Sequence, residues 1–214
     1  SRPVLEAILR DTVGIDRHAT DRDKAMAIMR YTRDIWINRP GADVMNAPYH
    51  SGTEEDIIDK QSKLCNELCR VLIVLSQIAG LPARYVGHIP GDHGTVELFV
   101  DGGWAYFDVR GQQFLQSDGR IASFATLRRD PHWIDQQTDR LKNDLAPGYT
   151  LDGTREFVRP DCMTFIANYF AWEACRYNFQ KIPNTPPLMA AVEATNPGWK
   201  ALKQKHYLNT DPIV

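Results

Sequence analysis

The chain has 214 residues, of which 43% are hydrophobic and 24% charged, proportions typical of a globular protein. Its formal net charge is -2 and no strongly basic block is present, so the sequence lacks the positive patch on which nucleic-acid binding depends. No apolar run approaches the ~20 residues of a membrane-spanning helix. We therefore expect neither nucleic-acid binding nor a membrane span.

The N-terminal part of the chain is predicted to be helical. Residues 3–10 have a short amphipathic pattern, and Thr20 is a suitable N-cap for a longer helix that reaches Trp36. Apolar residues recur at helical spacing in this longer helix, so we expect one of its faces to be buried. Residues 38–52 form a long irregular connection, of the kind that often serves as a lid or binding loop. Thr53 then caps a further short helix.

Residues 63–79 have the composition of a buried helix, because apolar residues lie on nearly all of its faces. Ser62 is the predicted N-cap, which places Cys65 at the third helical position. Gly80 and Pro82 predict the end of this helix, since glycine often follows a helix C-terminus and proline cannot continue one.

Three short β-type runs follow, at residues 83–87, 95–100 and 104–109. Asp101 and Gly102 connect the last two runs, and this dipeptide is a strong signal for a tight hairpin. The runs therefore predict an antiparallel sheet.

The rest of the chain is predicted to be mainly helical. After Pro160, the aromatic-rich run at residues 162–179 is expected to form a buried helix. We accordingly divide the chain into a core, residues 1–125, and a helical C-terminal extension, residues 126–214, that packs on the core as one compact unit.

We do not expect the four cysteines to form a disulfide framework. Cys65 and Cys69 lie one helical turn apart, a poor geometry for a bridge. Cys162 and Cys175 are expected ~20 Å apart on one helix, too far for a bridge. This favours a reducing compartment such as the cytoplasm. No signal peptide is visible, although a chain that begins at Ser1 could have lost a leader.

Cys65 lies at a helix start, where a thiolate is favoured. The macrodipole and the N–H groups of a first helical turn stabilise negative charge on a thiol, and they can also stabilise an oxyanion. A cysteine at such a position is more often a simple packing residue, however. A catalytic role therefore needs a neighbouring base.

The predicted hairpin brings a candidate base and a carboxylate together. If a two-residue turn connects the strands, Thr95 lies opposite Asp108. His93 is then the diagonal neighbour of Asp108 on the same face, with roughly 7–8 Å between their backbones. A three-residue turn would instead put the two side chains on opposite faces. With Cys65 as nucleophile, His93 as base and Asp108 as the group that orients it, the set is chemically complete.

The ordered pattern of these residues resembles the transglutaminase-like superfamily. In that family a catalytic Cys opens a helix that ends in Gly-Ile-Pro-Ala-Arg, followed by His-x-Trp-x-Glu leading a strand and Trp-x-x-x-Asp after a turn. The matching residues here are Cys65, residues 80–84 (GLPAR), His93, Glu97, Trp104 and Asp108. The resemblance implies a papain-like fold in which Cys65 is the nucleophile, His93 the base and Asp108 the orienting residue.

Three positions depart from the family's pattern. Lys63 stands where a glycine usually precedes the nucleophile, and Thr95 stands where the pattern has tryptophan. Val109 and Arg110 replace the Pro-Thr that usually follows the aspartate. Because these positions line the site, they alter the surface that a substrate would contact.

Other residues are candidates for supporting roles. The backbone N–H of Cys65 is the first candidate donor of an oxyanion hole, and Gln61 or the indole of Trp36 could supply a side-chain donor. His88, expected in a loop, and Thr95 could contact the substrate.

A zinc site is an alternative use of the same region. Cys65, Cys69, His88 and His93 have inner spacings close to those of a two-Cys, two-His site. The segment between the two pairs, however, contains a long apolar helix rather than a short finger turn. We therefore interpret Cys69 as a packing residue and expect no metal.

We expect an α+β fold in which a helical layer carries Cys65 and an antiparallel sheet presents His93 and Asp108. The expected function is thiol-dependent acyl transfer at an amide bond, most simply hydrolysis as in a cysteine peptidase or amidase. The alternatives are transglutaminase-type crosslinking to an amine and a catalytically inactive scaffold or binding domain, because a fold alone does not decide an activity. No metal or organic cofactor is needed. The expected partner is a peptide, a protein or another amide-containing substrate, and the oligomeric state stays open.

Overall fold

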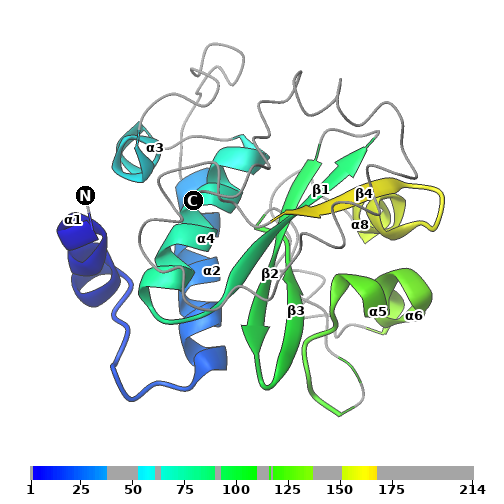
Figure 1. Cartoon of the computed structure of the whole chain (residues 1–214), viewed down its shortest axis with the longest axis horizontal. Coiled ribbons are helices and arrows are strands. Elements are labelled where there is room, and N and C mark those ends of the chain that lie inside the picture. Colours follow the sequence, from blue (N-terminus) through cyan, green and yellow to red (C-terminus); the bar gives the residue numbers. More distant parts are fainter. Residues whose placement is uncertain are drawn as a thin grey trace, which may run out of the picture.

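The computed structural model describes residues 2–37, 53–60, 64–89, 93–109, 116, 118–136 and 151–167 (Figure 1). The statements below concern these residues only. The predicted connection at residues 38–52 lies outside them, as does everything after residue 167.

The N-terminal helices agree with the predictions. Helix α1 (Arg2–Ala7) continues as a short π-helix, η1 (Ile8–Thr12), and helix α2 spans Asp21–Ile37. Thr20 caps α2 as expected, because its Oγ1 accepts a hydrogen bond from the backbone N–H of Asp23 at 3.1 Å.

Helix α3 (Glu54–Lys60) also begins at its predicted cap. Thr53 Oγ1 accepts from the N–H of Asp56 at 3.3 Å, and the carboxylate of Asp56 accepts from the N–H of Thr53 at 2.7 Å. A buried ion pair, Arg70 Nε to Glu54 Oε1 at 2.5 Å, joins α3 to the next helix.

Helix α4 (Cys65–Ile78) begins two residues later than the sequence predicts. Leu64 is the N-cap, with extended φ and ψ of -75° and 129°, so Cys65 occupies the first helical position rather than the third. The predicted N-cap, Ser62, lies outside the described residues. The helix ends where expected, and Gly80 follows it with a φ of +90°, a conformation that glycine adopts without strain.

Four antiparallel strands form one sheet: β1 (Ala83–Ile89), β2 (His93–Val100), β3 (Gly103–Phe107) and β4 (Met163–Ala167). Their order in the sheet is β3-β2-β1-β4. Helices and this sheet together give the expected α+β class.

The predicted two-residue hairpin turn is confirmed. Val100 pairs with Gly103 across the end of the hairpin. Asp101 and Gly102 both have positive φ, 51° and 77°, as a type I′ turn requires. Since the register follows from the turn, this local feature decides which residues of β2 and β3 share a face.

Strand β4 corrects the prediction for the C-terminal part. The run that begins at residue 162 was expected to be a helix, but residues 163–167 form a strand that pairs with β1, with His88 opposite Thr164. The expectation that Cys162 begins a long helix is therefore wrong, and Cys175 lies outside the described residues. The division at residue 125 stays a prediction.

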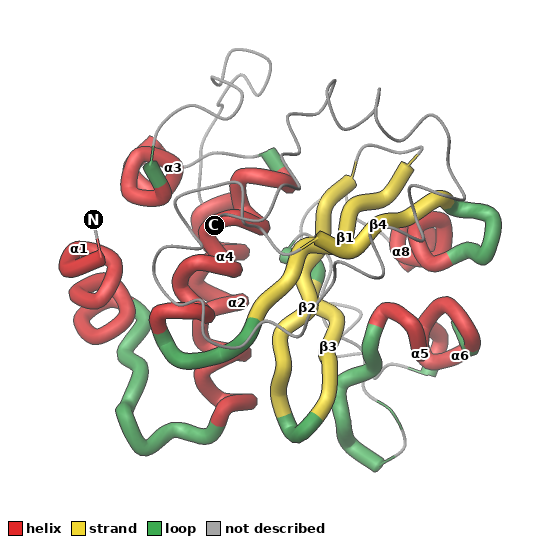
Figure 2. The backbone as a smooth tube through the Cα atoms, viewed as in Figure 1, coloured by secondary structure: helices red, strands yellow, loops and turns green. Residues whose placement is uncertain are grey.

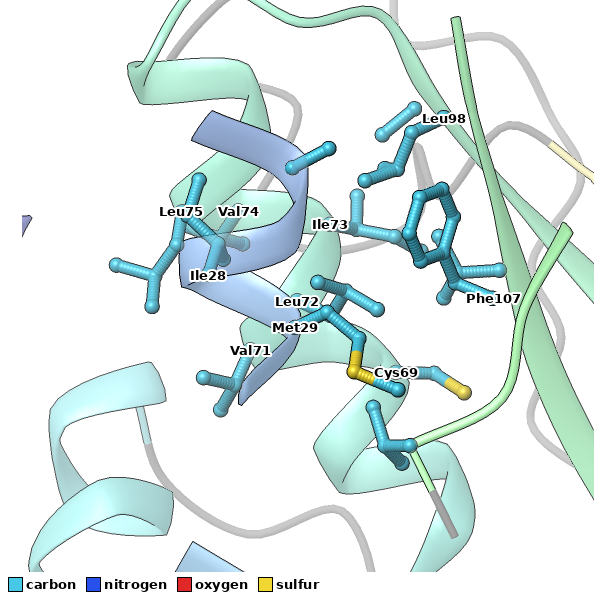
Figure 3. Close-up of a cluster of buried hydrophobic side chains, with 14 of the residues drawn as sticks. Ile28, Met29, Cys69, Val71, Leu72, Ile73, Val74, Leu75, Leu98 and Phe107 are labelled. Carbon is cyan, nitrogen blue, oxygen red and sulfur yellow. The ribbon is translucent and has the colours of Figure 1, made fainter. Parts of the chain in front are cut away.

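Helices cover both faces of the sheet (Figures 1 and 2). The first face packs against α4 and α2, and the close-up shows Leu98 and Phe107 of the sheet facing side chains of both helices (Figure 3). The second face is covered by α5 (Phe124–Arg129), α6 (His132–Asp135) and α8 (Leu151–Val158).

Neighbouring strand residues alternate between the two faces. Tyr85 belongs to the hydrophobic core on the α4 side, whereas Val86 belongs to the core beneath α5 and α8. Among the described residues, no helix is long and apolar enough to cross a membrane.

Candidate active site

His93 and Asp108 meet as the predicted register requires. Nε2 of His93 lies 2.7 Å from Oδ2 of Asp108, and both side chains are fully buried. Thr95 and Asp108 extend the β2–β3 register by one pair beyond Val96 and Phe107. A carboxylate that holds Nε2 leads us to treat Nδ1 as the ring nitrogen that would exchange a proton with a reaction partner.

The pair lies on the second face of the sheet. Glu97 lies two residues beyond Thr95 on the same face of β2. It accepts a hydrogen bond of 2.7 Å from the backbone N–H of Phe124 at the start of α5. Its other oxygen accepts from Nε of Arg84 at 2.8 Å. The residues at positions 93, 95 and 97 therefore face α5 and α8, whereas α4 packs on the opposite face.

His88 and Thr95 form a second buried pair beside the first. Nε2 of His88 lies 3.0 Å from Oγ1 of Thr95, whose hydroxyl is 3.4 Å from the carbonyl oxygen of Val86. His88 was expected in a loop, but it lies within strand β1 and is only 2% exposed. Thr95 is completely buried. In this structure both side chains belong to the interior rather than to a surface that a substrate could reach.

The surroundings of His88 keep its imidazole neutral. Burial, reinforced by the neighbouring His93, lowers the pKa of His88 to about 3. A donor at Nε2 would bond Thr95 Oγ1, and a hydrogen bond with the backbone of Phe157 opposes the lowering of the His88 pKa without reversing it.

Aromatic rings enclose both imidazoles. The ring of Phe157, on α8, lies 4.4 Å from that of His93 and 5.2 Å from that of His88, measured between centroids. Phe124 lies 5.4 Å from His88, and the two imidazoles stack 6.0 Å apart with an interplanar angle of 20°. Sequence reasoning missed Phe157, because nothing in the helical pattern of residues 151–158 relates it to the hairpin.

Cys65 belongs to the helical layer on the other face. It is a half-buried thiol, not part of a disulfide, at the first position of α4. Helix α4 runs antiparallel to β1, and each spans roughly 20 Å. The start of α4 and the start of β2 are thus at the same end of the two layers, as Figure 1 shows. This arrangement puts Cys65 at the end of the sheet where His93 also lies.

The side chains of the two candidate oxyanion-hole donors, Gln61 and Trp36, fall outside the part of the chain that the structure describes. Gln61 lies outside the described residues, and Trp36 is in the last turn of α2, with a side chain that is not described.

The zinc alternative requires residues that the fold separates. Cys69 is 1% exposed within the core between α4 and the sheet (Figure 3), whereas His88 lies on the other face. Within the described ranges, no group of three or more His, Cys, Asp or Glu side chains is arranged to hold a metal ion.

Comparisons with known proteins agree with the resemblance seen in the sequence. Residues 9–109 match the model of the transglutaminase-like superfamily. The comparisons with curated proteins and with solved structures gave no match. The matched range contains the start of α4, the hairpin and the hydrogen-bonded pair of His93 and Asp108. Over residues 9–109 the chain is therefore similar to the transglutaminase-like superfamily.

Proposed function

We propose that the protein catalyses thiol-dependent acyl transfer at an amide bond, with Cys65 as nucleophile, His93 as base and Asp108 as the residue that orients His93. The observation that carries this proposal is the buried hydrogen bond of 2.7 Å between His93 and Asp108. A superfamily built around cysteine-dependent catalysis supports it.

In the first step, His93 would accept the proton of the Cys65 thiol at Nδ1. The thiolate would attack the amide carbonyl, and the imidazolium would return its proton to the departing amine, leaving a thioester. Asp108 would fix the ring and stabilise its positive charge during both transfers.

The arrangement of α4 and the sheet determines how the proton would pass from Cys65 to His93. Because α4 and the His93–Asp108 pair lie on different faces of the sheet, the thiol would approach the imidazole around the end of β2 rather than through the sheet. The start of α4 would also supply backbone N–H groups for the oxyanion, since the first turn of a helix lacks intrahelical acceptors for them.

Hydrolysis is the outcome that needs the fewest assumptions. Water would attack the thioester with His93 again as base, releasing a carboxylic acid and restoring the thiol. Transfer to an amine, as in crosslinking, would use the same intermediate with a different acceptor. Neither outcome requires a metal or an organic cofactor.

The complete burial of His93 favours a second candidate, a non-catalytic binding domain. A base whose side chain is 0% exposed needs an opening before it can touch a substrate. In a binding domain, the pair with Asp108 would serve only to satisfy two buried polar groups.

The first experiment measures alkylation of Cys65 as a function of pH by peptide mass spectrometry. Cys69 and Cys162 are buried thiols in the same chain and serve as internal controls. We expect Cys65 to react much faster than both at pH 6, and to lose this advantage in His93→Gln, a variant that retains polar atoms at the position.

A further assay separates the outcomes. Release of a free acid from amide substrates supports hydrolysis, and incorporation of a primary amine with release of ammonia supports transfer. If Cys65 is as inert as the two controls in a protein that is folded by circular dichroism, the acyl-transfer proposal is wrong and the binding domain replaces it.

A further inference from the structure

We infer that Phe157 is a positioning residue, whose ring covers the imidazole of His93 and excludes water from the hydrogen bond between His93 and Asp108. Phe157 lies on α8, beyond residues 9–109. The consequence of this coverage for catalysis rests on the proposed function, whereas the exclusion of water from the hydrogen bond does not.

The distance and the angle between the two rings support direct coverage of His93 by Phe157. The rings of Phe157 and His93 are 4.4 Å apart between centroids and tilted by 32°. His93 is 2% exposed, whereas Phe157 is only half-buried. Part of Phe157 thus reaches the surface, whereas the imidazole that its ring contacts does not.

Water exclusion matters because of the strength of the bond beneath the ring. A hydrogen bond between an imidazole and a carboxylate is strengthened in a low dielectric, and water at the same site would compete for both partners. An apolar ring over the pair therefore keeps the imidazole in one orientation, with Nε2 directed toward Asp108.

Two sets of contacts hold the chain that directly follows α8 beside the pair. At the end of α8, the chain turns into β4, and the pairing of Thr164 with His88 puts this strand next to the second imidazole. Arg128, on α5, donates hydrogen bonds of 2.8 Å to Oγ1 of Thr164 and to the carbonyl oxygen of Cys162. The position of Phe157 is thus fixed by residues that the hairpin does not contain.

The alternative is that Phe157 only contributes to packing. Val158 provides a matched control, because it is the next residue of the same helix and is completely buried in the core beneath α8. Loss of side-chain volume at Val158 weakens the docking of α8 without removing a ring from His93.

The test measures exchange of the His93 ring N–H with solvent by 15N-edited NMR on the whole chain. In wild type we expect a resolved Nε2–H signal, and in Phe157→Ala we expect exchange to be at least tenfold faster or the signal to be lost. Val158→Ala should keep the signal, and Phe157→Tyr should restore it.

The inference is overturned if Phe157→Ala leaves the ring N–H as protected as in wild type, or if Val158→Ala exposes it equally. Alkylation of Cys65 in the same variants separates this inference from the proposed function. A tenfold fall at pH 6 in Phe157→Ala alone supports both, and a rise overturns positioning in favour of obstruction. If Cys65 is inert in wild type while Phe157 still protects the ring N–H, the positioning of His93 by Phe157 is supported and the proposed acyl transfer is wrong.

Discussion

His88 should make the protein sensitive to mild acid, and replacing it should remove this sensitivity. The perturbation is His88→Gln, which retains an amide donor for Oγ1 of Thr95. In the folded protein, burial lowers the pKa of His88 to about 3, against an ordinary value of 6.5. Between these two values the unfolded chain binds a proton at this position and the folded protein does not.

The direction of the pH dependence of stability follows from this difference in proton binding. A depressed pKa in the folded state means that the contribution of His88 to stability is fully present above pH 6.5 and is lost as the pH falls toward 3. One proton bound only by the unfolded state lowers the free energy of unfolding by about 1.4 kcal/mol per pH unit. At pH 4.5 the loss from His88 alone is therefore roughly 3 kcal/mol.

The assay is urea unfolding of wild type and His88→Gln at several pH values from 7 to 4.5. The variant should be less stable at pH 7 because its packing is disturbed, but its stability should fall less steeply toward acid. Parallel pH profiles for wild type and His88→Gln would refute the reasoning.

Three further predictions concern the candidate active site and the stability of the fold around it. Asp108→Asn should lower the rate of amide turnover, or of Cys65 alkylation at pH 6, by roughly 10²–10⁴-fold, because the imidazole loses its charged partner; an unchanged rate would contradict the assigned role. Glu54→Ala should destabilise the protein by about 3 kcal/mol in urea unfolding, because the guanidinium of Arg70 stays buried without this carboxylate, whereas Glu54→Gln should cost less. Gly102→Ala should cost about 1 kcal/mol in the same measurement, since a φ of 77° is unfavourable for any residue with a Cβ, and an equal stability would argue against the type I′ turn.

The helix starts and the hairpin could largely be predicted, because residues close together in the sequence determine them. Thr20 and Thr53 cap their helices through side-chain oxygens, a signal that is readable within four residues. The dipeptide Asp101-Gly102 determines the hairpin register, and the period of two along a strand then brings His93 to Asp108.

The parts that could not be predicted depend on distant pairing. Residues 163–167 (MTFIA) are apolar and partly β-branched, and a run this short is compatible with a helix or a buried strand. Only the open edge of β1 decides between them. The same pairing keeps His88 within a strand, whereas the β-type run predicted from the sequence ended at residue 87 and left His88 in a loop.

The beginning of α4 illustrates a smaller error. A serine before a helix is a common N-cap, yet Leu64, which has no capping side chain, precedes the first helical residue. The shift puts Cys65 at the first position, where its thiol is nearer to the end of the macrodipole than the sequence implied.

Strand β4 also has a consequence for the order in which the chain can fold during synthesis. Ile89 pairs with Met163, 74 residues later, so a ribosome must add all of the intervening residues before this edge of β1 is covered. Until then the nascent core presents a row of unpaired backbone groups, which is the kind of edge that recruits strands from other chains. Shortened chains that stop soon after residue 109 would keep that edge permanently open, and we expect them to aggregate where chains that reach residue 167 do not.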